Sequence, residues 1–262
     1  MKVSLVISTY NWKEALALCL QSVKKQTLIP FEVIVADDGS REDTKALIDE
    51  MRKDFPCTLK HVWHEDNGFR LSVIRNKAFA QCEGDYVIEV DGDIIMHSHF
   101  VSDHAAEARE GYFLTGSRGK ISEDLSKKLL QKGGGSLHFY TSGISRKFNV
   151  FRCPLMTPFF YNYKLHKKER GCNISFWKKD LFAVNGCDEK IIGYGFEDID
   201  FCARLRRLGI KKRFIKFKAI EFHIYHKAAN SKQDMTANEK VFEENNKMNI
   251  IKCEKGISQY LS

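Results

Sequence analysis

Apolar residues along the first hundred positions fall alternately into short continuous runs and into stripes of helical spacing. A short run bounded by turn residues is typical of a buried strand, whereas a period near 3.6 residues indicates an amphipathic helix. Because the two kinds of segment alternate, the pattern predicts an α/β, Rossmann-like fold with a mixed, mostly parallel sheet and helices on both faces. The predicted strands are Val3–Ser8, Phe31–Ala36, Leu59–His64 and Tyr86–Val90, with helices starting near Asn11, Ser40 and Leu71.

Two sequence patterns predict where the first two helices begin. Asn11 precedes Glu14 and Ser40 precedes Asp43 at the spacing of a capping box. In such a box the first side chain accepts a hydrogen bond from the backbone of the first helical turn, and the later acidic side chain bonds back. We therefore expect Asn11 and Ser40 to cap the helices that follow them.

The second half of the chain has a different pattern. Residues 118–170 are rich in lysine, aromatic residues and glycine, which predicts a partly mobile insert rather than a separate domain. We expect a single domain over residues 1–262. The remaining predicted segments are helices at Trp177–Val184 and Glu197–Leu208, an extended stretch at Arg213–Tyr225 and a polar, helical, peripheral tail at 231–262.

Charge and cysteine content narrow the class of protein. A formal net charge of +8 favours phosphate-bearing partners, including nucleotide-sugars, nucleic acids and anionic lipids. No stretch interleaves basic and aromatic residues in a nucleic-acid-binding motif, which disfavours a nucleic-acid partner. The apolar run after Lys2 is too short for a secretory leader, and no run is long enough to span a membrane. Together with eight scattered cysteines, this predicts a cytoplasmic protein with free thiols.

Acidic residues follow two of the predicted strands. Asp37 and Asp38 follow the second strand, and Asp91-Gly92-Asp93 follows the fourth. The carboxyl ends of parallel strands meet at one edge of a sheet, where α/β proteins bind ligands. Either cluster alone is more often a turn that caps a helix. Two clusters on the same edge favour a ligand site.

A divalent cation is the ligand that best suits the second cluster. Asp91 and Asp93 offer two carboxylates to a cation that would also bind diphosphate oxygens. His223 and His226, at the end of an extended stretch, are candidates for a further ligand, although such a pair taken alone is more often structural. We predict a Mn²⁺ (or Mg²⁺) site in which one or both imidazoles join these carboxylates.

A second group of candidates surrounds the start of the predicted helix at position 197. Glu197 and Asp198 lie in its first turn, where carboxylates stabilise a helix and remain ionised. Tyr194, between two glycines, offers a ring that can stack on a sugar. Asn67 and Arg75, around the start of the third helix, suit an anion.

Taken together, these motifs resemble family 2 glycosyltransferases of the GT-A fold. The second half is similar to the galactosyltransferase-type region of β-1,4-galactosyltransferases, polypeptide N-acetylgalactosaminyltransferases and bacterial chondroitin-type polymerases. The first resemblance rests on Val3–Asn11, Val33–Ser40, Asn67–Asn76 and Asp91–Asp93, and the second on Gly171–Asn173, Asn185–Gly186, Gly193–Asp198 and His226.

The resemblance implies an inverting transfer of a hexose or N-acetylhexosamine from a UDP-sugar to a carbohydrate hydroxyl, in polysaccharide or glycolipid synthesis. Residues 1–117 would form the nucleotide-sugar-binding half and 171–230 the acceptor half. Asp198 would act as general base, with Glu197 and Tyr194 contacting the acceptor. The implied donor contacts are Ser8, Tyr10, Asp38, Asn67, Arg75 and Asp91, and the implied metal ligands are Asp93 and His226.

Two other classes of protein stay open. A nucleotidyltransferase acting on sugar phosphates also uses carboxylates and metal, but it needs a glycine-rich phosphate loop, and Ser8–Lys13 contains no glycine. A non-catalytic binder of anionic polymers would fit the positive charge but needs no acidic residues at a sheet edge.

The transferase would use a carbohydrate or lipid-linked glycan as acceptor. Its insert, Lys120–Lys168, would lie near the acceptor entrance and approach the inner face of the plasma membrane.

Overall fold

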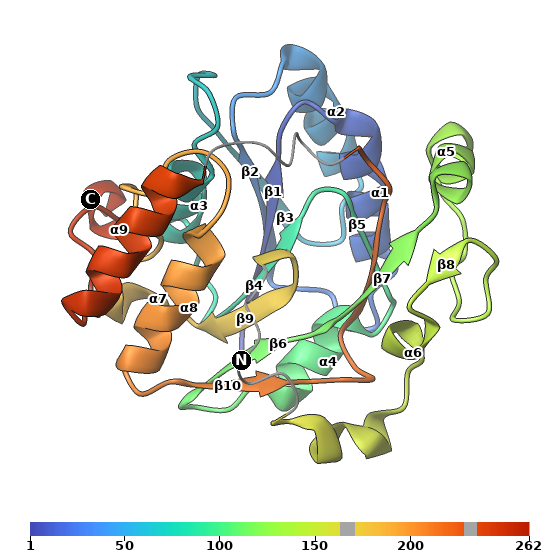
Figure 1. Cartoon of the computed structure of the whole chain (residues 1–262). Coiled ribbons are helices and arrows are strands. Elements are labelled where there is room, and N and C mark those ends of the chain that lie inside the picture. Colours follow the sequence, from blue (N-terminus) through green and yellow to red (C-terminus); the bar gives the residue numbers. More distant parts are fainter. Residues whose placement is uncertain (163–170, 228–234, 262) are drawn as a thin grey trace.

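The computed structural model describes residues 1–162, 171–227 and 235–261, and its centre is a seven-stranded sheet (Figure 1). The strand order is β10-β6-β9-β4-β1-β2-β3. β1 pairs in parallel with β2 and β4, whereas β9 runs antiparallel to β4 and β6. This confirms the predicted mixed, mostly parallel sheet. Its strands are β1 (Val3–Thr9), β2 (Glu32–Asp37), β3 (Thr58–Trp63), β4 (Tyr86–Asp91), β6 (Tyr112–Thr115), β9 (Ile174–Trp177) and β10 (Lys211–Phe214).

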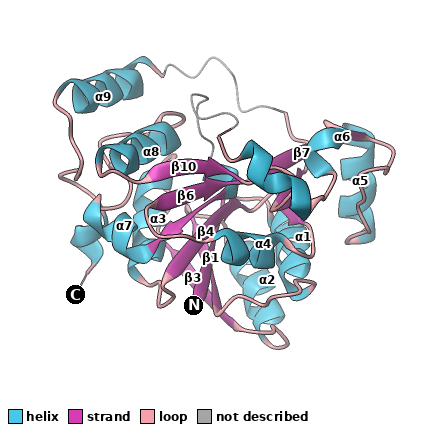
Figure 2. Cartoon of the chain, turned by 90° about the horizontal axis from the view of Figure 1, so that it is seen from below, coloured by secondary structure: helices cyan, strands magenta, loops and turns pink. Residues whose placement is uncertain are grey.

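Helices cover both faces of this sheet because its central strands are apolar on both sides (Figure 2). Successive side chains of a strand point to opposite faces. Leu5 and Ile7 of β1 therefore belong to one core cluster, and Val6 belongs to the other. The first core includes residues of α1 (Lys13–Lys24), α2 (Glu42–Arg52) and α4 (Phe100–Glu107), and the second includes residues of α3 (Leu71–Ala80), α7 (Lys178–Ala183) and α8 (Glu197–Arg207).

The predicted caps of the first two helices are wrong. Neither α1 nor α2 has a side-chain cap, and Asn11 adopts a left-handed conformation with φ of +46°. The Ser40 hydroxyl instead accepts a hydrogen bond from the Asn11 backbone N–H (2.7 Å), and the Asn11 side chain accepts one from the Arg41 N–H (3.0 Å). Because the loops after β1 and β2 meet at one sheet edge, these side chains join the loops to each other.

The segment expected to be an insert contributes to a second sheet, of order β5-β11-β7-β8. Side chains such as Ile121 and Phe222 pack from it against Leu18 of α1. Residues 118–162 are therefore built into the fold, and residues 163–170 lie outside the described residues. The elements are β5 (Ile94–Met96), β7 (Ser117–Ile121), β8 (Ile144–Ser145), β11 (Ile220–His223), α5 (Glu123–Lys132), α6 (Lys147–Val150) and the 3₁₀ helices η1 (Pro154–Phe160) and η2 (Gly171–Asn173).

The C-terminal tail is helical, as predicted, but it does not lie wholly at the surface. It contains α9 (Thr236–Lys247) and the 3₁₀ helix η3 (Ile257–Tyr260). Cys253 and Ile257 are buried, and Ile257 belongs to the core cluster beneath α3. None of the helices in the described ranges combines the length and apolar character needed to cross a bilayer. All eight cysteines lie within those ranges and are free, as predicted.

Candidate active site

A cleft of about 1200 Å³ opens at the carboxyl ends of β1, β2 and β4. Asp38 and Asp93 both line it, which confirms that the two acidic clusters share one sheet edge. Asn67 lies in an exposed loop and is not among the lining residues, so the structure does not bring it to the cleft. The other predicted site residues do line the cleft: Ser8, Tyr10, Asp38, Arg75, Asp91, Asp93, Tyr194, Glu197, Asp198, His223 and His226.

Asp93, His223 and His226 form a compact cluster at this edge. One Asp93 carboxylate oxygen, Oδ2, lies 3.2 Å from Nε2 of each histidine. The three ligand atoms lie within 4.8 Å of one another. The Ile224 backbone N–H donates to the Asp93 carbonyl (2.9 Å), which holds the loop after β4 against the end of β11. Chain segments more than a hundred residues apart are thereby brought to one point.

The chemistry of this cluster fits a divalent cation. Oδ1 of Asp93 is buried and has no hydrogen-bond partner, so a carboxylate oxygen is available to a ligand. Burial lowers the pKa of His223 to about 4, and the imidazole therefore keeps a free lone pair at neutral pH. The hydrogen bond to Asp93 raises the pKa of His226. One carboxylate with two imidazoles suits Mn²⁺ better than Mg²⁺.

Arg75 of α3 connects the acidic residues of the cleft. Its side chain is 2% exposed, and its Nε lies 2.7 Å from a Glu89 oxygen of β4. Its Nη1 donates to Asp198 Oδ1 of α8 at 2.8 Å, and its Nη2 lies 3.6 Å from Asp91 Oδ1. Three elements are thereby joined through one guanidinium. Sequence reasoning missed Glu89, for which the only signal was an acidic residue inside an apolar strand.

The carboxylates around Arg75 outnumber its guanidinium. Burial raises the pKa of Glu89 to about 8, although the contact with Arg75 lowers it. Burial and the neighbouring Asp93 raise the pKa of Asp91 to about 7. Crowded carboxylates stabilise an added positive charge. The electrostatics of the cluster therefore also favour a cation beside Asp93.

The start of α8 forms the opposite wall of the cleft. Asp198 Oδ2 accepts a hydrogen bond from the Gly171 backbone N–H (2.6 Å), while Oδ1 accepts from Arg75. Each oxygen keeps a second lone pair, and the side chain is 22% exposed. Glu197 is buried, and burial followed by the charge of Asp198 raises the pKa of Glu197 to about 7. Two adjacent carboxyl groups thus have different environments.

The loop before α8 has unusual backbone geometry. Gly193, Gly195 and Phe196 all have positive φ, and Phe196 has φ of +74° with its side chain buried. A left-handed conformation at a bulky residue costs on the order of 1–3 kcal/mol and is found mostly at functional sites. Tyr194, between the glycines, is 51% exposed beside the cleft.

Asp38 lies at the other end of the cleft and is held firmly. Its Oδ1 bonds to His64 Nε2 (2.7 Å), and its Oδ2 accepts from the Arg70 backbone N–H (2.9 Å). Tyr10 is 49% exposed, and its hydroxyl donates to Asp66. Ser8 Oγ lies 3.3 Å from Arg75 Nε. Polar groups therefore extend from Tyr10 to the cluster of Asp93, His223 and His226.

Comparisons with known proteins identify this arrangement. The family model described as glycosyl transferase family 2 matches residues 4–170, and that described as the N-terminal domain of galactosyltransferase matches residues 155–227. The chain belongs to glycosyl transferase family 2. These two matches confirm the resemblance predicted from the sequence. The site of this glycosyltransferase can therefore be explained without the activity of a nucleotidyltransferase or of a non-catalytic binder.

Two curated relatives illustrate the membership. The chondroitin synthase of Escherichia coli is 29% identical over 84% of this chain and 34% of its own length. The GalNAc(5)-diNAcBac-PP-undecaprenol beta-1,3-glucosyltransferase of Campylobacter jejuni is 25% identical over 70% of this chain and 62% of its own length. The glycosyltransferase therefore spans about a third of the first relative and less than two thirds of the second.

A solved structure supports the GT-A fold. The structure of GalNAc-T7 with UDP, GalNAc and Mn²⁺ matches 93% of this chain and 48% of that chain, with a TM-score of 0.69 and 16% sequence identity. At that identity the likeness concerns the fold.

Several cleft residues of the glycosyltransferase were missed by sequence reasoning. Arg118 and Lys120 enter from β7, and the Arg118 guanidinium contacts the Cys172 sulfur at 3.0 Å. Met235 and Glu239 enter from the C-terminal segment that was expected to be peripheral. Nothing in the local sequence distinguished these side chains from other surface residues, because long-range packing brings them to the cleft.

Proposed function

We propose that this glycosyltransferase transfers a hexose or N-acetylhexosamine from a UDP-sugar to a carbohydrate hydroxyl, with inversion at the anomeric carbon. The observation that carries the proposal is the meeting of two groups in one cleft, the Asp93–His223–His226 cluster and the Asp198 carboxylate at the start of α8. The UDP and Mn²⁺ named for the GalNAc-T7 structure support this donor and this metal.

The donor half would use the residues at the sheet edge. Asp93, His223 and His226 would hold Mn²⁺ or Mg²⁺, which when bound supplies positive charge to the diphosphate. Tyr10 and Asp38 would contact the nucleotide base. Asp91 would contact the ribose, with Ser8 and Arg75 completing this side.

The chemical step would depend on Asp198. The acceptor oxygen forms a bond to the anomeric carbon while the bond to the diphosphate breaks, and UDP departs with the electron pair. The hydroxyl proton passes to Asp198, and such proton transfer contributes roughly 10²–10⁴-fold to the rate. Arg75 and the Gly171 N–H hold the carboxylate in place. Glu197 and Tyr194 would orient the acceptor.

A direct test is a panel of UDP- and GDP-sugars, combined with p-nitrophenyl glycosides as acceptors and scored by nucleotide release. The expected result is acceptor-dependent release from at least one UDP-sugar in the presence of Mn²⁺, and its loss in excess chelator. Release from GDP-sugars alone, or full turnover in chelator, would contradict the proposal.

A lipid-linked glycan is the natural acceptor that we favour. The name of the Campylobacter jejuni relative describes such an acceptor. Phe148, Leu155 and Phe159 are each more than 80% exposed, and Phe148 directly follows the basic residues Arg146 and Lys147. Apolar and basic side chains together suit a membrane surface with anionic lipids. We propose a peripheral position at the cytoplasmic face of the plasma membrane.

A further inference from the structure

Helix α9 lies beyond both ranges matched by the family models, which end at residue 227. It nevertheless borders the cleft. Met235, just before its first turn, and Glu239 are lining residues. Figure 1 shows α9 beside α8, whose first turn carries the proposed base. The wall of the site is therefore completed by a segment outside the matched ranges.

The most deeply buried residues of α9 are polar. Its two buried residues are Asn238 and Asn245, which lie two helical turns apart and so on the same side of the helix. A buried amide must find hydrogen-bond partners, and hydrogen bonds are directional. Contacts of this kind fix the position of a helix more strictly than an apolar stripe does.

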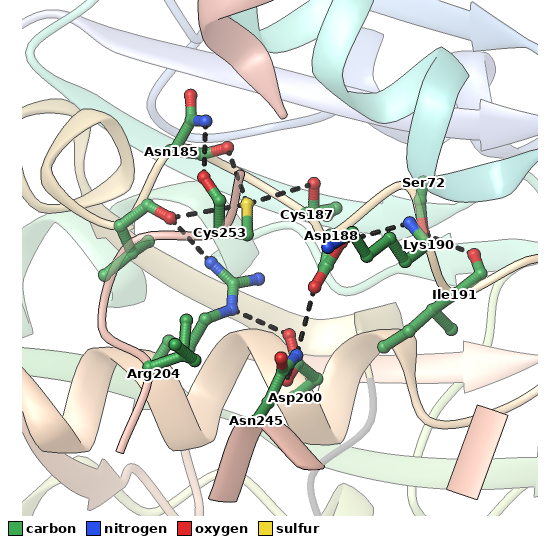
Figure 3. Close-up of polar contacts among 12 residues, drawn as sticks. Ser72, Asn185, Cys187, Asp188, Lys190, Ile191, Asp200, Arg204, Asn245 and Cys253 are labelled. Atoms are coloured by element: carbon green, nitrogen blue, oxygen red, sulfur yellow. Dashed lines mark hydrogen bonds and ion pairs between the residues drawn. The ribbon is translucent and has the colours of Figure 1, made fainter. Parts of the chain in front are cut away.

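Asn245 anchors α9 to the body of the molecule. Its Nδ2 donates to Asp188 Oδ2 and to Asp200 Oδ1, each at 3.0 Å (Figure 3). Asp200 is fully buried and also accepts from Arg204 Nε at 2.7 Å. The amide therefore joins α9 to α8 and to the loop before it.

Asn238 bonds to the loop that carries Tyr194. Its Oδ1 accepts from the Ile192 backbone N–H (3.2 Å), and its Nδ2 lies 3.1 Å from the Gly195 carbonyl and 3.3 Å from that of Tyr194. One side chain thus holds both ends of a loop whose residues have positive φ at Gly193 and Gly195. This loop leads directly into Glu197 and Asp198.

Among the residues that the structure describes, the charged side chains that α8 and α9 offer to the cleft are acidic. Glu197 and Asp198 come from α8, and Glu239 comes from α9. The basic residues Arg118 and Lys120 come instead from β7, where Lys120 lies opposite His223 in the strand pairing, on the side of the proposed metal. Carboxylates accept hydrogen bonds from sugar hydroxyls and repel a second carboxylate. Although the chain has a net charge of +8, the described side chains of α8 and α9 at the cleft are carboxylic acids.

We propose that α9 is the acceptor-selecting wall of the glycosyltransferase, with Asn238 a positioning residue for the Tyr194 loop and Glu239 a specificity residue that favours an uncharged terminal sugar over a uronic acid. This inference rests on the proposed function and adds to it the class of acceptor. Glu239 contacts the acceptor, and Asn238 acts through the loop.

The test compares neutral p-nitrophenyl glycosides with p-nitrophenyl β-glucuronide as acceptors. We expect the wild-type kcat/KM to favour a neutral sugar by about tenfold or more, because the repulsion between two neighbouring carboxylates is of that order. Glu239→Gln should reduce this preference at least about threefold, whereas Glu243→Gln, an exposed change of the same chemistry one turn further on, should leave it unchanged. Equal use of glucuronide by the wild type would overturn the inference.

The positioning role of Asn238 has its own readout. Asn238→Ala should raise the acceptor KM by about tenfold while UDP affinity, measured by calorimetry with Mn²⁺, stays the same. Asn245→Ala removes the other anchor of α9 and should lower the melting temperature without the same rise in KM. Equal changes of acceptor KM in the two variants would mean that Asn238 is merely structural. Absence of transfer to every acceptor by the wild type would instead contradict the proposed function itself.

Discussion

Glu197 and Asp198 are adjacent in the sequence but differ in their surroundings. Asp198 is partly exposed and accepts hydrogen bonds from Arg75 and Gly171, whereas Glu197 is buried and its Oε2 has no hydrogen-bond partner. Burial penalises the charged form of Glu197 and raises its pKa to about 7. The site therefore separates a carboxyl group held by two hydrogen bonds from one whose pKa lies near neutral pH.

This difference predicts that Glu197→Gln changes the free energy of unfolding by an amount that depends on pH. A carboxyl group whose pKa is raised from 4.5 to about 7 by folding stabilises the fold while protonated. That stability is complete below about pH 4.5 and is lost as the pH rises to about 7. Glutamine imitates the protonated form. The free energy of unfolding of the variant should therefore exceed that of the wild type by on the order of 1–3 kcal/mol at pH 8 and should equal it at pH 4.

Urea denaturation at several pH values measures this effect, with Glu65→Gln at an exposed position as the control. A variant that is equally or less stable than the wild type at pH 8 would refute the assigned environment of Glu197.

At the scale of elements, the C-terminal segment is part of the core. Cys253 is buried beside the loop after α7, and its sulfur lies 3.4 Å from the Asn185 carbonyl oxygen. The Ser258 backbone N–H donates to the Asn185 side chain at 2.8 Å. η3 also packs against α3, which carries Arg75.

Gly256→Ala tests the close packing of this segment. A Cβ atom at position 256 would lie 1.8 Å from the Asn185 carbonyl oxygen, which is too close for any side chain. The substitution should lower the free energy of unfolding by about 1–3 kcal/mol through overpacking. Ser258→Ala, at an exposed side chain in the same segment, should change it by less than about 0.5 kcal/mol. Equal effects of the two substitutions on the urea midpoint would show that the tail is loosely attached.

At the scale of the whole molecule, the proposed membrane contact gives a further prediction. The wild type should sediment with vesicles of phosphatidylglycerol and phosphatidylcholine, and the double variant Leu155→Glu/Phe159→Glu should sediment several-fold less, because carboxylates replace two exposed apolar side chains. Met248→Glu/Ile251→Glu places the same charges on exposed residues of the C-terminal segment and serves as control. Equal sedimentation of both double variants would contradict a membrane contact at η1.

The acidic part of the site could be predicted from the sequence because parallel strands bring their carboxyl ends to one edge. Asp38 and Asp93 needed only that rule, whereas the late histidines were candidates by residue type and family resemblance singled out His226. The roles of Arg118 and Asn238 could not be predicted, since the first depends on the pairing of β7 with β11 and the second on the docking of α9. β9 was missed for the same reason, because its antiparallel place between β4 and β6 is set by long-range pairing.

The central claim is that Asp198 accepts the proton of the attacking hydroxyl in an inverting transfer. Asp198→Asn keeps the size of the side chain but removes the proton acceptor. The decisive measurement is the initial rate of this variant with the UDP-sugar selected from the panel, together with the anomeric configuration of the wild-type product by NMR. The account predicts a rate at least about 10²-fold lower, unchanged UDP binding with Mn²⁺, and an inverted product. A rate near that of the wild type, or a product that retains the donor configuration, would contradict it.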